Sequence, residues 1–268
     1  MAFNPHIIYG NYFLGLAAAV PTCLAAKHIW DIYRRVSHVP RCRVVEEDGV
    51  SESFRKSHTL EGLVNPRQHL FVGDTRYVDL FLSKHVEDET ILAAFVGGFF
   101  GRKVFAPERI ALEIVGKRFT SFSGLGPEDD IDWISNKADV PSGHLPALRA
   151  MLFGAFQVSH VHIDQDPARG GTTNCIDFVY GSDQGRFAGA HRFSIVRDRS
   201  QPKAVRVVFE SASCNPTQNQ PFAPAFLFSF HRLYAMLLFR ESIANVLEIL
   251  NDGTTTAVTF RDRESVPR

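Results

Sequence analysis

The sequence contains few cysteines, no excess of either charge and no long basic run. Its four cysteines show no CxxC or CxxH spacing, which argues against a disulfide scaffold and against a structural zinc site. Lys and Arg total 29, Asp and Glu total 29, and no basic run exceeds two residues, so nucleic acid is not an expected partner. Because the sequence also lacks an N-x-S/T sequon, we expect a reducing, intracellular location, either the cytoplasm or the cytoplasmic face of an internal membrane.

Several motifs of common enzyme classes are missing. The chain has no Walker loop, no strand-linked GxGxxG, no GxSxG and no HExxH. These absences argue against nucleotide hydrolysis, dinucleotide-dependent redox chemistry and serine-hydrolase chemistry. We therefore expect a protein that works without an organic cofactor.

Phenylalanine is the residue type that the sequence has in unusual abundance. There are 23 Phe against six Tyr and two Trp, in a chain that is 45% hydrophobic and 22% charged. The overall composition is that of a globular protein. Phe adds a large apolar surface without a polar group, so this excess predicts either a thick core or an apolar cavity.

The N-terminal segment has two interpretations. Residues 7–26 carry no charge and are followed by Lys27, Arg34 and Arg35, and their number is just sufficient to span a bilayer. A spanning segment with this basic flank would place the rest of the chain on the cytoplasmic side. The alternative is an amphipathic helix packed on the domain. We divide the chain into a hydrophobic N-terminal helix (1–36), a connecting stretch (37–66) and a ligand-binding domain (67–268).

The hydrophobic pattern of the main body predicts strands and helices that are segregated along the chain. A strand over residues 76–82 precedes two helices over 88–105 and 107–117. In the second helix Ile110, Leu112, Ile114 and Val115 form a stripe that we expect to be buried. The remaining predicted elements are strands over 156–165, 173–182, 186–198 and 204–213, a long helix over 221–250 and a short strand within 254–260. This order indicates an α+β fold in which a curved antiparallel sheet packs on the long C-terminal helix.

Two stretches of the sequence resemble known proteins. Residues 188–235 resemble an uncharacterised START-like (helix-grip) family, through a Gly-x-His strand, a second strand that ends in a polar Ser/Cys-x-Pro turn, and a helix after it. Residues 77–115 resemble small fungal proteins found among natural-product tailoring enzymes. The first resemblance implies a hydrophobic ligand held between the sheet and the last helix. The second implies a substrate from secondary metabolism.

Three side chains are the predicted catalytic groups. In a strand over 186–198, His191 shares its face with Phe193 and Ile195, and an imidazole that borders a lumen can act as an acid or a base. On the last helix, His231 and Tyr234 are three residues apart and lie on one side. The residues expected to bind substrate lie on the neighbouring strands, on the last helix and in the long loop 123–144: Asp177, Arg192, Glu210, Phe193, Phe226, Phe230 and Trp133.

Each of these residues also has a structural interpretation. His191 can be a hydrogen-bonded core residue, and the pair on the last helix can be part of a helix–sheet interface. Asp177 and Glu210 are costly to bury unpaired, so they are expected either to face solvent or to bind Arg.

The stretch FQVSHVHIDQD raises the question of a metal site. Alternation along a strand places Phe156, Val158, His160, His162 and Asp164 on one face, where two imidazoles and a carboxylate are suitable metal ligands. No further ligand is marked elsewhere in the chain. We therefore favour the other interpretation, the polar face of a strand that leaves the core.

The sequence predicts a cofactor-independent cyclase or isomerase that acts on a hydrophobic terpenoid or polyketide intermediate in an apolar pocket, including by pericyclic cyclisation. A shaped pocket accelerates such a reaction by holding a flexible substrate near its reactive conformation. The first alternative is a non-catalytic lipid or sterol carrier that is tethered by residues 7–26. The second is a metal-dependent enzyme built on His160, His162 and Asp164.

Overall fold

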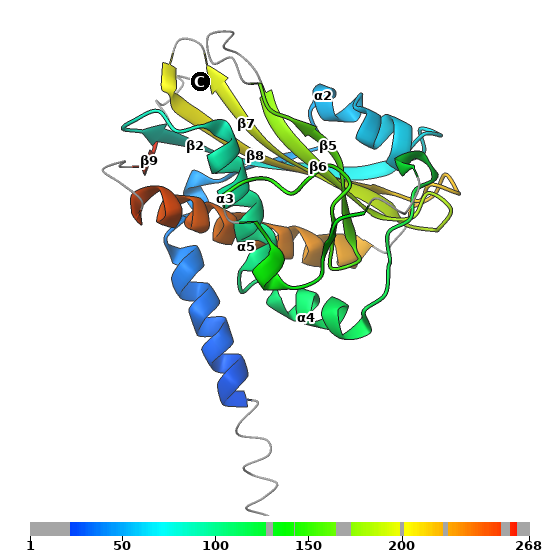
Figure 1. Ribbon diagram of the computed structural model, residues 1–268, viewed down its shortest axis with the longest axis horizontal. Helices are drawn as coiled ribbons and strands as arrows, with labels where there is room; N and C mark the ends of the chain where they lie inside the picture. Colours follow the sequence, from blue (N-terminus) through cyan, green and yellow to red (C-terminus); the bar gives the residue numbers. More distant parts are fainter. Residues whose placement is uncertain are drawn as a thin grey trace, which may run out of the picture.

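The fold is a nine-stranded mixed sheet that bends and twists, with helices on both faces (Figure 1). The computed structural model describes residues 22–126, 131–141, 143–164, 173–198, 201–221, 225–252 and 258–261, with the backbone alone for residues 198, 202, 225–229 and 252. The strand order is β1-β2-β8-β7-β6-β5-β4-β3, and β9 pairs with β2 beyond β1. The strands are β1 (Val45–Asp48), β2 (Phe71–Leu82), β3 (Trp133–Ile134), β4 (Met151–Leu152), β5 (Phe156–His162), β6 (Thr173–Gly181), β7 (Ala188–Asp198), β8 (Gln201–Cys214) and β9 (Val258–Phe260).

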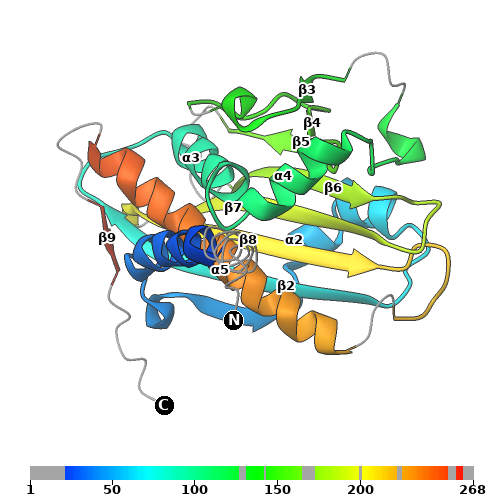
Figure 2. The ribbon, with the colours of Figure 1, turned by 90° about the horizontal axis from the view of Figure 1, so that it is seen from below.

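The helices form two unequal layers. The N-terminal helix (residues 22–37), α3 (Asp88–Gly101), α4 (Ala106–Val115) and α5 (Ala225–Asp252) lie on one side of the sheet, as Figure 2 shows from below. The other side is covered by α2 (Glu52–Arg55) and a π-helix (His58–Val64) (Figure 1). Short 3-10 helices occur at Arg41–Arg43, Ser123–Leu125 and Lys137–Asp139.

The α+β class predicted from the sequence is confirmed, with one change in the sheet. All strand pairs are antiparallel except β3 and β4, which pair in parallel at the edge, so the sheet is mixed rather than purely antiparallel. The stretch 37–66, which the sequence suggested was a connector, contributes β1 to the sheet and buries Phe54, Leu60, Leu63 and Val64 against β6, β7 and β8. Its apolar side chains are closely spaced and cover what would otherwise be an exposed apolar face.

The larger core lies between the sheet and helices α3 and α5. Alternate residues of each strand point to this side, so Phe178, Phe193 and Phe209 come from three adjacent strands. Phe193 and Phe209 contact the ring of Phe99 on α3, and Phe178 contacts the ring of Phe100. Ring centroids are 5.2 Å apart for Phe95–Phe193 and 5.0 Å apart for Phe99–Phe193, both in edge-to-face geometry. Much of the phenylalanine excess therefore forms a continuous aromatic core.

Helix α4 differs from the prediction in the direction of its apolar stripe. It begins near Pro107 and ends at Gly116, whose φ of 58° is the left-handed conformation common after a helix. However, Ile110, Ile114 and Val115 are exposed rather than buried. The helix is attached instead through Arg109, a buried residue that donates a 2.8 Å hydrogen bond to the carbonyl of Phe100.

Most of the predicted N-terminal hydrophobic segment 7–26 lies outside the described residues, which begin at residue 22. Within the described ranges, no helix has the length and apolar character needed to cross a membrane.

The position of α3 depends on a close approach to α5 at Gly98. A Cβ atom built there would lie 2.7 Å from the Cα of Ser242 and 2.8 Å from the Cβ of Asn245. Neither atom can move without moving the backbone of α5. Because Gly98 has no side chain, α3 can lie close to α5, and the adjacent residue Phe99 packs on the sheet against Phe193.

We predict that Gly98→Ala lowers the free energy of unfolding by about 1–3 kcal/mol, because the methyl group pushes α3 away from α5. Gly97→Ala is the matched control, since its new Cβ would meet only the carbonyl oxygen of Pro141 at 3.7 Å. This control should be neutral or stabilise the helix by about 0.5–1 kcal/mol. Urea unfolding of both variants measures the difference, and equal stabilities would contradict the close contact.

Candidate functional site

A cavity of about 340 Å³ lies between the sheet and the N-terminal half of α5. Its apolar lining comes from α3, the start of α4, four strands and the β6–β7 turn, and its aromatic members are Phe99, Phe105, Phe156, Tyr180, Phe187 and Phe209. The volume falls at the lower end of the range of small-molecule sites. The cavity is therefore suited to a compact, largely apolar guest.

One wall of the cavity carries a polar row that crosses three strands. Asp74 of β2, Ser211 of β8 and His191 of β7 are direct neighbours in the sheet register, and all three line the cavity. In the next row Ser213 of β8 also lines it, and its hydroxyl lies 2.9 Å from the hydroxyl of Tyr180. These polar groups concentrate at one side of an otherwise apolar space, which is the usual way in which a pocket orients its ligand.

His191 is enclosed by aromatic rings. Its ring centroid is 4.6 Å from that of Tyr180 and 5.1 Å from that of Phe209, and it stacks on Phe156. The side chain is only 7% exposed, and its Nδ1 atom has no hydrogen-bond partner among the described residues. Burial, with smaller contributions from His231 and Arg76, holds the pKa of His191 well below its ordinary value. The imidazole is thus neutral at pH 7 and can act as a base.

Helix α5 brings the two other predicted catalytic residues to the same cavity. His231 and Tyr234 both line it from the helix side, opposite the strand that carries His191. Burial lowers the pKa of His231, although Asp74 opposes this shift, and burial raises the pKa of Tyr234. The Tyr234 hydroxyl donates a 3.0 Å hydrogen bond to Glu108 of α4, so it also links the two helices beside the cavity. The prediction that these three residues meet is consistent with the geometry.

Several lining groups were not found from the sequence. Asp74 accepts a hydrogen bond from Arg76, which is fully buried beside the cavity and also donates a 2.9 Å hydrogen bond to Glu46. The sequence contained a signal for these two residues: at every second position of β2, Asp74 and Arg76 share one face with the buried apolar residues Val78 and Leu80. Ser211, Ser213, Tyr180 and Glu108 lie at positions that only the sheet register and the helix packing bring to the cavity.

Three residues predicted to bind substrate lie on the other face of the sheet. Asp177, Arg192 and Glu210 are neighbours across β6, β7 and β8, and all are buried beneath the 37–66 stretch. Arg192 donates two hydrogen bonds to Asp177, of 2.7 and 2.8 Å, and lies over the ring of Phe54. Glu210 accepts a 2.5 Å hydrogen bond from the backbone of Ser51. They do not line the cavity, because they alternate with the residues that do.

Three of the predicted aromatic contacts, Phe193, Trp133 and Phe230, also do not line the cavity. Phe193 is a fully buried core residue behind His191, and Trp133 is half exposed on β3 at the far edge of the sheet. Phe230 is exposed on α5, where it stacks on Tyr234. The side chain of Phe226 lies outside the described residues.

The geometry does not form the metal site considered for β5. The register shifts between Val158 and His160, so that Val158 pairs with Phe178 but His160 pairs with Asp177. This bulge turns His160 and His162 to the opposite face from Phe156 and Val158, which corrects the predicted common face. Within the described part of the chain, no group of three or more His, Cys, Asp or Glu side chains is arranged to hold a metal ion.

The Asp177–Arg192 pair is predicted to be structural. Asp177→Ala would leave Arg192 charged and buried, and should lower the free energy of unfolding by about 3–5 kcal/mol. The matched control is Asp79→Ala, which breaks the exposed two-point pair with Arg206 and should cost less than about 1 kcal/mol. Denaturant unfolding compares the two, and a small effect at Asp177 would argue against the buried pair.

A second prediction concerns the pH dependence of stability. His191 and His231 have lowered pKa values in the folded chain, so below about pH 6.5 the unfolded chain binds protons that the folded chain does not. Stability should therefore decrease as pH falls, by up to about 1.4 kcal/mol per pH unit for each group. His191→Phe, which fits the surrounding aromatic cluster, should reduce this slope between about pH 6.5 and 5. Unfolding curves measured at several pH values test this, and an unchanged slope would contradict it.

The cavity combines an apolar lining with one neutral imidazole on the sheet and a second on the helix. Phenol and hydroxyl groups adjoin them, so the site has groups that can accept, donate and position a proton. No protein-family model, curated protein or solved structure matches the chain.

Proposed function

We propose that the chain is a START-like protein that converts a compact, largely apolar molecule by cofactor-independent isomerisation or cyclisation. The observation that carries this proposal is His191, a neutral imidazole that lines an apolar cavity with its Nδ1 atom unpartnered among the described residues. Leaving a buried polar atom unpaired costs about 1–3 kcal/mol, so such an atom at a cavity needs an explanation. A bound molecule with a hydrogen-bonding group is that explanation.

The START-like part of the proposal is supported by the order of the elements. A strand, two helices, a run of strands and a long helix follow one another as β2, α3, α4, β3 to β8 and α5. The cavity lies between the sheet and this last helix, where the resemblance of residues 188–235 implies a ligand. Fold alone does not imply an activity, so the chemistry is argued from the side chains.

The proposed chemistry is a proton transfer within one substrate. His191 takes a proton from a carbon next to a carbonyl group, while a hydroxyl of Ser211 or Tyr180 donates a hydrogen bond to the carbonyl oxygen that gains charge. The protonated imidazole exchanges this proton with solvent and then delivers a proton to a different carbon, so the product is an isomer and the step balances. The apolar wall holds the substrate in its reactive conformation.

The substrate class follows from the size and polarity of the cavity. A guest with one polar end and an apolar body would direct its polar end to the Asp74–Ser211–His191 row and its body to the aromatic lining. A terpenoid or polyketide intermediate has these properties, and the resemblance of residues 77–115 to tailoring proteins points in the same direction.

A lipid or sterol carrier is the alternative from another class. A carrier requires the cavity but no titratable group inside it, so the buried imidazole favours an enzyme. Replacing His191 therefore separates the two functions, because a carrier would keep its ligand and an enzyme would lose its turnover.

The experiment measures proton exchange in D₂O with a panel of compact terpenoid and polyketide ketones and enones. The wild-type chain should incorporate deuterium into at least one of them, as detected by mass spectrometry. His191→Phe should lower that rate by about 10²–10⁴-fold, because the general base is lost. His160→Phe, on the opposite face of β5, is the matched control and should keep the wild-type rate.

Two outcomes would overturn the proposal. If His191→Phe retains the exchange rate, His191 is not the base. If a compound raises the thermal midpoint of wild type and His191→Phe equally and no compound exchanges, the chain is a carrier.

A further inference from the structure

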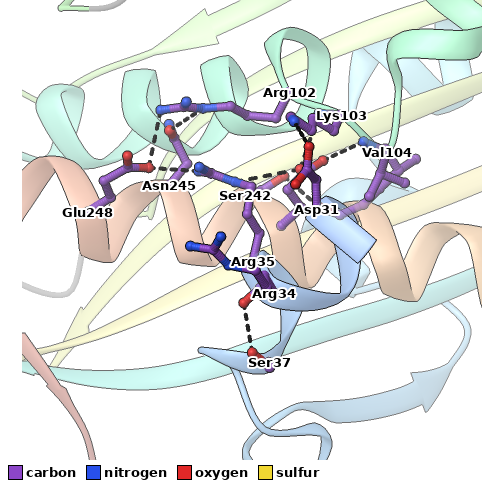
Figure 3. Close-up of polar contacts among 12 residues, drawn as sticks. Asp31, Arg34, Arg35, Ser37, Arg102, Lys103, Val104, Ser242, Asn245 and Glu248 are labelled. Atoms are coloured by element: carbon purple, nitrogen blue, oxygen red, sulfur yellow. Dashed lines mark hydrogen bonds and ion pairs between the residues drawn. The ribbon is translucent and has the colours of Figure 1, made fainter. Parts of the chain in front are cut away.

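The N-terminal helix projects away from the rest of the molecule and is attached near its C-terminal end (Figure 1). Arg35 donates a 2.7 Å hydrogen bond to Glu248 of α5, and Asp31 pairs with Lys103, which follows α3 (Figure 3). Arg240 of α5 further donates to the carbonyl of Val36, at 2.9 Å. One side of the helix is therefore held by polar contacts.

The other side of this helix presents apolar and aromatic residues to solvent. Ile29, Trp30 and Tyr33 are 65%, 59% and 64% exposed, and the rings of Trp30 and Tyr33 stack with their centroids 5.9 Å apart. With Ala26 they follow helical spacing, so they form one stripe. A contiguous exposed apolar stripe of this kind marks an interaction surface.

A second exposed apolar stripe lies on the same side of the sheet. Helix α4 exposes Ile110 and Ile114, one turn apart, and Figure 2 shows α4 and the N-terminal helix on the face seen from below. Helix α5 also exposes Phe230 and Leu233, next to the cavity-lining residue Tyr234. The helical side of the molecule thus carries apolar groups on three helices.

The sequence and charge of the N-terminal region indicate what covers this surface. Residues 7–26 contain no charged residue and lead directly into the described helix at residue 22. After them the helix carries Lys27, Arg34 and Arg35 against one acid, Asp31. Asp31 pairs with Lys27 and Lys103, and Arg35 pairs with Glu248, so Arg34 is the basic residue of this helix for which no acidic partner is seen among the described residues. Trp and Tyr beside Lys and Arg, at the end of an uncharged run, are typical of a helix at a membrane–water interface.

We propose that the exposed side of the N-terminal helix, formed by Ile29, Trp30 and Tyr33, docks on the surface of a bilayer that contains anionic lipid. A bilayer is a better partner than a second copy of the chain because the stripe continues into an uncharged run and is flanked by basic residues. This inference goes beyond the proposed function and does not depend on it.

The experiment uses the full chain with vesicles of phosphatidylcholine, with and without phosphatidylserine. The chain has two tryptophans, so in Trp133→Phe all tryptophan emission comes from Trp30. Anionic vesicles should shift this emission to shorter wavelength, and added salt should weaken the shift. The double substitution W30S/Y33S should lower the vesicle-bound fraction in a flotation assay by about tenfold or more, because it removes two aromatic side chains that the bilayer would bury.

Trp133→Ser is the matched control, because it removes the other exposed tryptophan, at the far edge of the sheet, and should leave binding unchanged. Thermal midpoints equal to that of wild type establish that both variants are folded. If Trp30 emission does not shift and W30S/Y33S binds vesicles as wild type does, this face is not the membrane contact. If W30S/Y33S instead dissociates an oligomer seen by light scattering while vesicle binding is unaltered, the face joins two copies of the chain.

Discussion

The structure depends on the way in which the space beneath α5 is filled. Under the C-terminal half of this helix, rings from α3 and from three strands interlock into a solid aromatic core. Under its N-terminal half, the sheet presents Asp74, Ser211 and His191 in place of further apolar side chains. Such groups are costly to bury without partners, so dense packing stops where they begin. The cavity lies at that boundary.

The wall that carries this polar row is held from behind. Residues of β6, β7 and β8 that point away from the cavity include Asp177, Arg192 and Glu210, which are buried beneath the 37–66 stretch. Their hydrogen bonds join the strands to one another and to Ser51. A strand fixed on one face holds the side chains of its other face in position, as a site that orients a substrate requires. The face of the sheet that carries Asp177, Arg192 and Glu210 is therefore structural, and the opposite face lines the cavity.

The helical side of the molecule connects the cavity with its surroundings. Helix α4 is attached through Arg109 and through the hydrogen bond between Glu108 and Tyr234, two residues that line the cavity. The N-terminal helix is attached by ion pairs at one end, and both helices present apolar residues outward.

The sequence by itself predicted the longer elements and three residues that line the cavity. Helix α3 and strands β5 to β8 have strong apolar periodicity. The alternation of side chains along β7 and the three-residue spacing on α5 predicted that His191, His231 and Tyr234 point toward a common cavity, and all three line it. The tertiary structure alone decided which face each remaining residue occupies. Both faces of β6 are buried. Alternation therefore shows that Asp177 and Phe178 lie on opposite faces, but it does not show which of these faces is on the side of the cavity. The bulge in β5 and the outward stripe of α4 likewise depend on pairing and packing partners that are distant in the sequence.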